Sequence, residues 1–468
     1  MLHAITYKDI YLSLPGFLYI QKIEIEEWPG KHGTMYVEAV MAEETDALAF
    51  YEISETVSVH YRSQGEEKIL FKGVITQSFL ESLGKLRVIK IQAKDATYWM
   101  DIDRKKRCFQ DTSRTVADII GEIMNGYEES DWICNIPKEP VGRLLFQYEE
   151  TDWEFLNRLL SRYHECLYPS ALFQMIHYQA GVSIQEENTD WDRLPYSKKK
   201  DFACLEYLRQ NGFGSLLSSN FTVYDLENFD VVSLGSRISY RGRPWYVSGV
   251  RRELKNGLLV NFYELRQKES MLKECYYNPR LTGTSAYAVV ADTRRDRVQV
   301  IMQDEALGEH CYWFPFSSVS SSSDGSGWYC MPEKGESVRI YFPTEREEEG
   351  YVITCIQSHE PSGGEDPMGN PAVRSISTAT ENLVQFNEDG ILIEAQKGGA
   401  KVSLGKEGAV CVLAPGGIDL SPELSCSFET KAMDCEAATS LQFCDDAGAS
   451  VIAGAAGMFL SGQEIYEN

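Results

Sequence analysis

Pairs of apolar residues recur at short intervals through residues 372–468, and this repeat limits the possible folds more than any other feature of the sequence. Each pair has i, i+2 spacing, which places both side chains on the same face of a short strand. Successive pairs begin 7, 11, 8, 8, 8, 7, 8, 10 and 7 residues apart, with Gly or charged residues between them. The pattern predicts an internal repeat of strand and turn. The pairs are Val384/Phe386, Ile391/Ile393, Val402/Leu404, Val410/Val412, Ile418/Leu420, Cys426/Phe428, Met433/Cys435, Leu441/Phe443, Val451/Ala453 and Met458/Leu460.

A single ribbon of such strands has too little core to be stable. Two inward side chains in eight residues contribute roughly 3–6 kcal/mol of apolar burial, whereas ordering eight residues costs about 12 kcal/mol. A lone ribbon also leaves both sheet edges open. Three copies wound about one axis would supply edge partners and share a dry core, so we predict a homotrimeric β-prism or β-helix needle over residues 372–468. The alternative is a single-chain β-solenoid, whose coils are usually longer and have three faces per turn.

Composition narrows the possible functions. The chain has 468 residues, of which 43% are apolar and 12% aromatic, which excludes a disordered chain and favours several domains. The net charge of −25 repels phosphate backbones and anionic lipids, so we expect no nucleic-acid partner and no stable membrane insertion. No apolar run approaches the roughly 18 residues of a membrane helix. The first residues lack a basic region followed by an apolar stretch, so we expect synthesis in the cytoplasm without a signal peptide.

The twelve cysteines show no metal-binding spacing. No two of them are closer than nine residues, so there is neither a CxxC motif nor a zinc-ribbon pattern. In a reducing compartment we expect them to act as small buried hydrophobic residues. They are Cys108, Cys134, Cys166, Cys204, Cys275, Cys311, Cys330, Cys355, Cys411, Cys426, Cys435 and Cys444.

Residues 1–270 are predicted to be mainly β with a minor α part. Alternating segments such as "GTMYVEAVMA" and "LRVIKIQAKDAT" predict a barrel-like fold over residues 1–100, and similar patterns predict a second one over about 175–268. A helical insert at 110–165 separates the two. We expect these parts to form one domain.

Two helices are predicted in this insert. Thr115 with Asp118 and Thr151 with Glu154 have the spacing of N-terminal capping boxes, and Gly126 is a plausible stop for the first helix. The apolar faces are Val116, Ile119, Ile120, Ile123 and Met124 in the first helix, and Leu156, Leu159, Leu160 and Tyr163 in the second.

Residues 285–358 contain five short strand patterns separated by turns, which is typical of an OB-fold barrel. Within it, "SSVSSSSDGSGW" reads as a mobile loop and Glu345–Glu349 as a solvated turn. Linkers are expected at 271–284 and, rich in Pro and Gly, at 359–371.

Three segments resemble the VgrG family of type VI secretion spikes and the related hub-and-spike proteins of contractile phage tails. "RCFQDTSRTVADIIGEIM", from Arg107, resembles a family segment that leads into a helix. "QYEETDWEFLNRLL", from Gln147 to Leu160, is similar to the family pattern Gln-Tyr-x-Glu-x-Asp-x-x-Phe-x-x-Arg-Leu. In the OB-like unit, Pro332, Gly335, Glu336 and Val338 hold the places of the family's spike-base barrel.

The resemblance implies a contractile machine. A trimeric hub of six similar barrels would dock on a hexameric inner tube protein, among baseplate proteins, and an OB collar and needle would follow. A small PAAR-like tip protein or an effector would cap the needle, and contraction would expel the assembly. Type VI systems, extracellular injection particles, tailocins and phages all share these parts.

Added functions known in the family are not expected in this chain. The 359–371 linker leaves no room for a lysozyme insert, and the repeat continues to Asn468 without a C-terminal effector domain. The last histidine is His359, so we expect no metal-binding tip in the chain.

No catalytic, cofactor-binding or metal-binding residues are predicted, and no cofactor. The sequence contains no HExxH and no GxSxG motif. Gly84-Lys85 is not part of a Walker motif, because the upstream Gly of that motif is missing. His164 beside Glu165 is read as helix-end polarity rather than an acid–base pair. The histidines have no ligand spacing; they are His3, His32, His60, His164, His177, His310 and His359.

Two other groups of residues resemble binding sites, but we predict structural roles for both. Arg158 and Arg162 near Glu154 are predicted to form a helix-surface ion pair rather than a phosphate clamp. Trp313 and Trp328 could stack nucleic-acid bases in an OB barrel, but the acidic chain favours core or interface packing.

The sequence therefore predicts a non-enzymatic trimeric spike. The alternatives are a peptidoglycan-degrading tail spike enzyme and, with less support, an OB-type nucleic-acid-binding protein.

Overall fold

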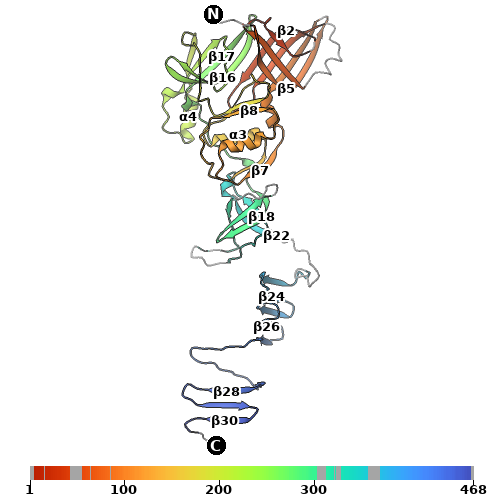
Figure 1. The fold of residues 1–468 in the computed structure, drawn as a ribbon, viewed down its shortest axis with the longest axis vertical. Helices are drawn as coiled ribbons and strands as arrows, with labels where there is room; N and C mark the ends of the chain where they lie inside the picture. Colours follow the sequence, from red (N-terminus) through yellow and green to blue (C-terminus); the bar gives the residue numbers. More distant parts are fainter. Residues whose placement is uncertain are drawn as a thin grey trace. The chain divides into compact units, whose positions relative to one another are not determined.

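The computed structural model describes residues 5–464 except 15, 43–54, 64, 85, 303–311, 321, 323–327 and 357–368. Two compact units form, Met1–Ser358 and His359–Asn468. Strands dominate both units, which confirms the mainly β prediction (Figure 1). No helix in the described part of the chain is both long and apolar enough to cross a membrane.

The first unit begins with a barrel-like arrangement of six strands in the order β1-β4-β5-β6-β3-β2. Its interior holds the alternating apolar residues, among them Ile23, Val37, Val59, Phe71 and Ile91. The strands are β1 (Ile10–Leu12), β2 (Phe17–Glu27), β3 (Thr34–Met41), β4 (Thr56–Ser63), β5 (Glu66–Leu83) and β6 (Leu86–Asp95).

Strand β2 joins this half to the second one, although no alternating segment predicted it. It pairs antiparallel with β16, matching Glu24–Glu27 with Val250–Glu253. The two expected barrels therefore share a single twelve-stranded sheet. Register shifts near Phe17 and Ile20 break the period-two alternation of β2, which explains why the pattern did not reveal it.

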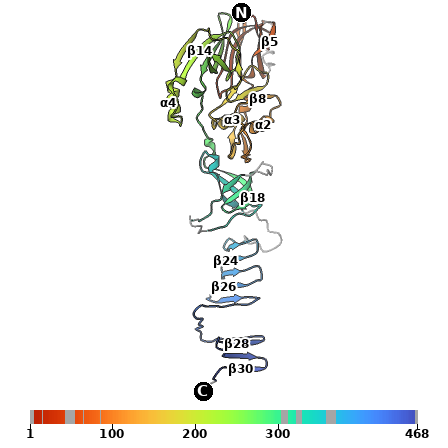
Figure 2. The same ribbon diagram turned by 60° about the vertical axis from the view of Figure 1, so that its left-hand side comes forward.

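The second half continues the sheet as β16-β17-β14-β13 (Figure 2). Strand β15 also pairs with β16, and β12 pairs with β15. A short helix, α4 (Phe202–Gln210), was not predicted, because only Leu205 and Leu208 of its side chains are buried and its apolar face is too brief to show a period. The strands are β12 (Glu186–Glu187), β13 (Tyr196–Lys200), β14 (Thr222–Asn228), β15 (Arg237–Tyr240), β16 (Arg243–Lys255) and β17 (Leu258–Arg266).

Both predicted helices of the insert are present. Thr115 caps α2 (Val116–Met124) and Thr151 caps α3 (Asp152–Ser161), each with a complete capping box. The apolar faces of α2 and α3 pack into one core with Phe109 and Tyr178. The remaining elements are η1 (Ala96–Asp101), β7 (Lys105–Phe109), β8 (Ser130–Cys134), β9 (Leu145–Glu150), β10 (Leu167–Pro169) and β11 (Ile176–Ala180).

The five OB-like strand patterns form a five-stranded barrel in the order β20-β19-β18-β21-β22. A parallel bridge between Phe316 and Val352 closes it. Parts of the Ser-rich loop and of the 359–371 linker lie outside the described residues. The strands are β18 (Thr284–Arg294), β19 (Arg297–Met302), β20 (Trp313–Pro315), β21 (Ser337–Phe342) and β22 (Tyr351–Ile356).

The second unit contains two antiparallel meanders of short strands. Seven of the ten predicted apolar pairs lie on these strands. Ile418/Leu420, Cys426/Phe428 and Met433/Cys435 do not, because residues 414–439 have no neighbouring strand within their own chain. The strands are β23 (Arg374–Ser377), β24 (Leu383–Asn387), β25 (Gly390–Glu394), β26 (Lys401–Gly405), β27 (Val410–Leu413), β28 (Ser440–Cys444), β29 (Ser450–Gly454) and β30 (Gly457–Ser461).

The prediction of buried cysteines is wrong for most of them. Cys108 and Cys166 are buried, whereas six are exposed within the single chain. Four of the six lie in the C-terminal unit, whose described residues form no core, and the other two lie on the surface of the OB-like barrel. His3, His310, Cys311 and His359 lie outside the described residues. The exposed cysteines are Cys330, Cys355, Cys411, Cys426, Cys435 and Cys444.

Replacing Thr151 by Ala is expected to lower the free energy of unfolding by about 1 kcal/mol, because the Thr151 hydroxyl caps α3 and also donates to Asp101 Oδ1 at 2.6 Å. Urea denaturation of the full chain measures the change. Thr282→Ala, at an exposed site, is the control and should have almost no effect. Equal effects of the two substitutions would contradict the capping role.

Candidate functional site

The C-terminal unit carries a continuous apolar face. Cross-strand register aligns Val384 with Ile393 and Phe386 with Ile391. The alignment continues into the following strands, since Ile391 lies opposite Leu404. In the last meander, Phe443, Val451 and Leu460 lie in one row. The i, i+2 pairs predicted from the sequence thus form ladders on one side of each sheet, which we call the apolar ladder. Its members are Ile376, Val384, Phe386, Ile391, Ile393, Val402, Leu404, Val410, Val412, Leu441, Phe443, Val451, Ala453, Met458 and Leu460.

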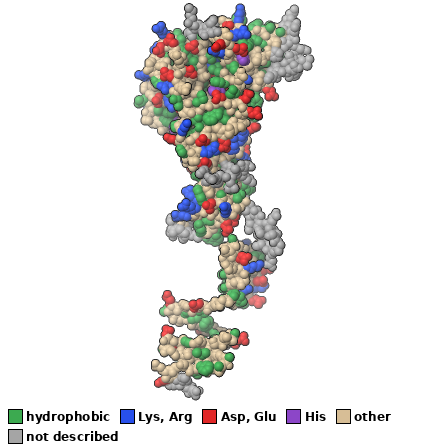
Figure 3. Space-filling model, viewed as in Figure 1, with side chains coloured by type: hydrophobic (Ala, Val, Ile, Leu, Met, Phe, Trp, Pro, Cys, Tyr) green, Lys and Arg blue, Asp and Glu red, His purple; other side chains and the backbone are tan. Residues whose placement is uncertain are grey.

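No described residue of the chain covers the apolar ladder. Every described side chain between residues 369 and 464 is at least partly exposed, and Leu404 in the middle of a sheet is 41% exposed. Apolar side chains are accordingly visible on the surface of this unit (Figure 3). The opposite side of the strands is mixed: Gln385 and Ser403 lie there beside Leu392, and Gln442 lies beside Ile452 and Phe459. An apolar face of this size on a sheet without a core marks an association surface.

The twelve-stranded sheet of the first unit also has open edges. Among the described residues, β13 pairs only with β14, and residues 77–83 of β5 pair only with β6. Unpaired backbone groups of this kind can bind further strands.

A buried ion-pair network connects the helical insert with the OB-like barrel. Arg158 on α3 is 1% exposed, and its Nε and Nη2 donate to the two carboxylate oxygens of Glu150, each at 2.7 Å. Its Nη1 donates to Glu347 of the barrel, and Arg162 Nη2 donates to the other oxygen of Glu347 at 2.5 Å. The network therefore bridges segments almost two hundred residues apart in sequence.

This network corrects two predictions. Arg158 and Arg162 do not form a helix-surface pair with Glu154, which binds Arg280 instead. The Glu345–Glu349 turn is not fully solvated, because Glu347 on η5 (Glu347–Glu349) is completely buried. The amphipathic pattern of α3 identifies its apolar residues only. It could not show that Arg158 and Arg162 bind Glu347, which lies far along the chain.

Burial and charge act in opposite directions on these carboxyl groups. Burial alone would raise the pKa of Glu347, but the charges of Arg158 and Arg162 hold it below its ordinary value. Burial raises the pKa of Glu150 despite its hydrogen bonds from Arg158. Glu347 is thus the ionised centre of the junction.

Most residues of the family-like segment that begins at Gln147 are buried, and its side chains form hydrogen bonds between neighbouring elements. Asp152 accepts hydrogen bonds from Gln147 Nε2 at 3.0 Å, Tyr127 Oη at 2.7 Å and Lys105 Nζ at 2.7 Å. It also pairs with Arg107 of the other family-like segment. These bonds tie β7, β9 and α3 together, so the motif has a structural role.

His164 and Glu165 have separate partners. His164 Nδ1 lies 3.0 Å from the Lys273 carbonyl, and Glu165 pairs with Lys268 at 3.5 Å. This arrangement agrees with the reading of helix-end polarity. In the barrel, Trp313 is partly buried and Trp328 is 58% exposed, so Trp328 is not part of the core. No group of metal-ligating side chains occurs among the described residues.

Comparisons with known proteins agree with this architecture. Residues 33–165 match the family model of the phage tail baseplate hub (GPD). An E. coli protein, c3393, described as a type VI secretion component similar to the T4 tail proteins gp27 and gp5, has a TM-score of 0.50 at 13% identity, covering 74% of this chain and 99% of that one. The lidless PdpA–VgrG complex has a TM-score of 0.52 at 8% identity, covering 84% and 93%. The lidded Francisella PdpA–VgrG complex has a TM-score of 0.50 at 9% identity, covering 97% and 79%.

Among curated proteins, none matches this chain in sequence. The resemblance to VgrG-family spikes and phage tail hubs is nonetheless confirmed, and the chain has their hub-and-spike fold.

Replacing Arg158 by Met is expected to lower the free energy of unfolding by about 3–5 kcal/mol, because it leaves two buried carboxylates without their shared cation. Arg143→Met is the matched control, since Arg143 pairs with the neighbouring Glu348 at 3.9 Å on the surface and should cost less than about 1 kcal/mol. Chemical denaturation measures both. Similar losses for the two variants would contradict the role of the buried junction.

The junction should also respond to acid. A carboxyl group whose pKa is lowered in the folded state stabilises the protein above its ordinary pKa, and this contribution is lost as the pH falls through the lowered value. We expect the wild type to be more stable than Glu347→Gln at pH 7, with a difference that shrinks below the ordinary pKa of 4.5. Denaturation midpoints at several pH values test this. A difference that does not change with pH would refute it.

Proposed function

We propose that the protein is the homotrimeric hub and spike of a contractile injection apparatus, a structural component rather than an enzyme. The apolar ladder is the observation that carries this proposal, because it gives the C-terminal unit a large face to bury and no core of its own. Three copies would turn their ladders toward a common axis and form one dry interior.

The first unit is suited to the upper part of such a particle. Its two barrel-like halves share one sheet that ends in open edges, and these edges can extend the sheet into neighbouring copies. A trimer would then present six similar barrel-like halves to a hexameric inner tube protein, among baseplate proteins. Residues 285–358 would form the collar and residues 372–468 the needle.

The lower end of the needle would carry a PAAR-like tip protein or an effector. The assembly would be built in the cytoplasm and expelled on contraction to puncture a target envelope. A rod stabilised by strands from three chains unfolds slowly, which suits it to being driven through such an envelope.

The mass of the purified full chain tests the trimer. We expect about three times the single-chain mass of 53.0 kDa by light scattering coupled to gel filtration. A stable single chain of 53.0 kDa at micromolar concentration would refute the proposal.

A pair of substitutions on β26 tests the role of the apolar ladder. Leu404→Asp would place three carboxylates in the proposed dry interior, so we expect the trimeric needle to be lost and residues 372–464 to become sensitive to protease. Ser403→Asp changes the adjacent residue on the opposite face and should leave both properties unchanged. Equal protease resistance of the two variants would contradict a buried ladder.

A further inference from the structure

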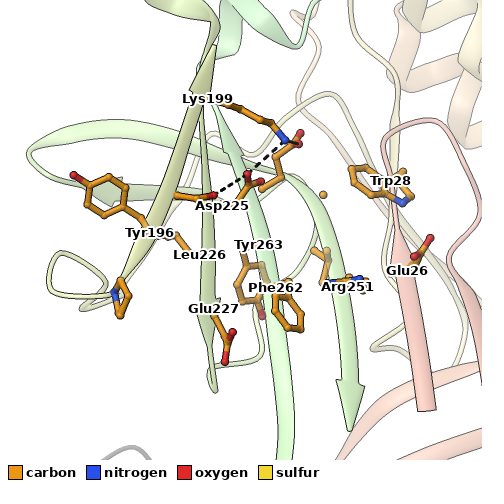
Figure 4. A pocket seen from close by; sticks show the side chains of 15 residues that line it. Glu26, Trp28, Tyr196, Lys199, Asp225, Leu226, Glu227, Arg251, Phe262 and Tyr263 are labelled. Atoms are coloured by element: carbon orange, nitrogen blue, oxygen red, sulfur yellow. Dashed lines mark hydrogen bonds and ion pairs between the residues drawn. The ribbon is translucent and has the colours of Figure 1, made fainter. Parts of the chain in front are cut away.

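A groove of about 630 Å³ crosses the exposed side of the sheet in the second half of the hub (Figure 4). Its floor is a transverse row in which Glu227, Phe262, Arg251 and Glu26 lie opposite one another on β14, β17, β16 and β2. Trp28 forms one wall. The opposite face of these strands packs in the core, so only the groove side is available to a ligand.

Two charges in this row have no ion-pair partner among the described residues. The Arg251 guanidinium lies 4.5 Å from the centre of the Phe262 ring and makes no described salt bridge. Glu26 lies directly across from it on β2 and has no described hydrogen bond or salt bridge. The other charges in the groove are paired, since Lys199 binds Asp225 and Glu264, and Glu227 binds Lys255.

Trp28 is an aromatic platform at the edge of this row. It is 38% exposed, and its ring lies against Gly249, where an added Cβ would come within 2.4 Å of the ring. Gly249 stands at a register shift of β16. Because Gly249 has no side chain, the Trp28 ring can lie directly against the strand at this position.

We propose that this groove binds an oligosaccharide of β-linked pyranose rings. A β-1,4-linked chain is extended and flat and can follow the straight row across the four strands, whereas an α-1,4-linked chain curves away from it. Such a ring has an apolar face of C–H groups that can stack on Trp28, and hydroxyls at its edge that can donate to Glu26 and accept from Arg251. Planar side chains such as Arg and Glu can bond two neighbouring hydroxyls at once. The volume lies within the usual range for ligand sites.

The charges that line the groove favour a sugar over a nucleic acid or a lipid. One free cation next to one free carboxylate leaves no net charge for a phosphate backbone, which the paired carboxylates around them would repel. A lipid chain laid on the floor would desolvate Arg251 and Glu26 without giving them a partner, which is costly. A neutral ligand that both donates and accepts hydrogen bonds is the best match.

The test uses the full chain and defined sugars in isothermal titration calorimetry. The probes are hexamers of β-1,4-linked N-acetylglucosamine and of β-1,4-linked glucose, with the α-1,4-linked glucose hexamer as the comparison. We expect at least one β-linked hexamer to bind more tightly than the α-linked one. Trp28→Ala and Arg251→Ala should each weaken that binding about tenfold.

Trp99→Ala is the matched control, because Trp99 is 40% exposed on η1 and does not line the groove. It should leave binding unchanged. Gly249→Ala offers an independent check, since it displaces Trp28 without changing a polar group, and it should weaken binding as Trp28→Ala does.

Three outcomes would overturn the proposal. The first is that neither β-linked hexamer binds at about 1 mM. The second is that Trp28→Ala binds the hexamer as tightly as the wild type. The third is that a second copy of the chain occupies the groove. In the last case no hexamer would bind and Arg251→Glu would change the mass of the assembly. The mass of the assembly is measured separately from sugar binding, so failure of this proposal is distinguishable from failure of the proposed spike function.

Discussion

The exposed apolar ladder of the C-terminal unit is the constraint on which the proposed assembly depends. Backbone pairing within the chain orders the strands and aligns the ladder, as the register of Ile391 between Phe386 and Leu404 illustrates. Pairing alone leaves this face in water, and a two-dimensional ribbon has no second layer to cover it. In the proposed trimer the missing layer comes from identical copies, which already carry the matching face.

The first unit is stabilised in the opposite way, by cores and paired charges within the chain. Cys108, Leu144 and Phe146 of the insert pack into the core of the OB-like barrel, and the Arg158–Glu347 pair lies beside this contact. A buried ion pair is costly unless every partner is present, so the junction tolerates few alternative geometries. The hub and the OB-like barrel consequently form one compact unit.

Local patterns in the sequence predicted the structural features that depend on residues close together in the chain. The capping boxes at Thr115 and Thr151, the five strands of the OB-like barrel and seven of the ten apolar pairs follow from short-range spacing. Features that depend on distant partners could not be read this way. Glu347 looks like part of an acidic turn until Arg158 and Arg162 are placed beside it. Strand β2 was hidden by its bulges, and the groove forms only when β2 meets β16.

Hydrogen exchange of the full chain, followed by mass spectrometry over a dilution series, tests the central claim most directly. If the apolar ladder is buried between copies, amides of β24 to β27 should be strongly protected in the assembled protein. They should lose this protection together as dilution produces single chains. Strong protection of these strands in a verified single chain would mean that the C-terminal unit folds alone, and it would contradict the account.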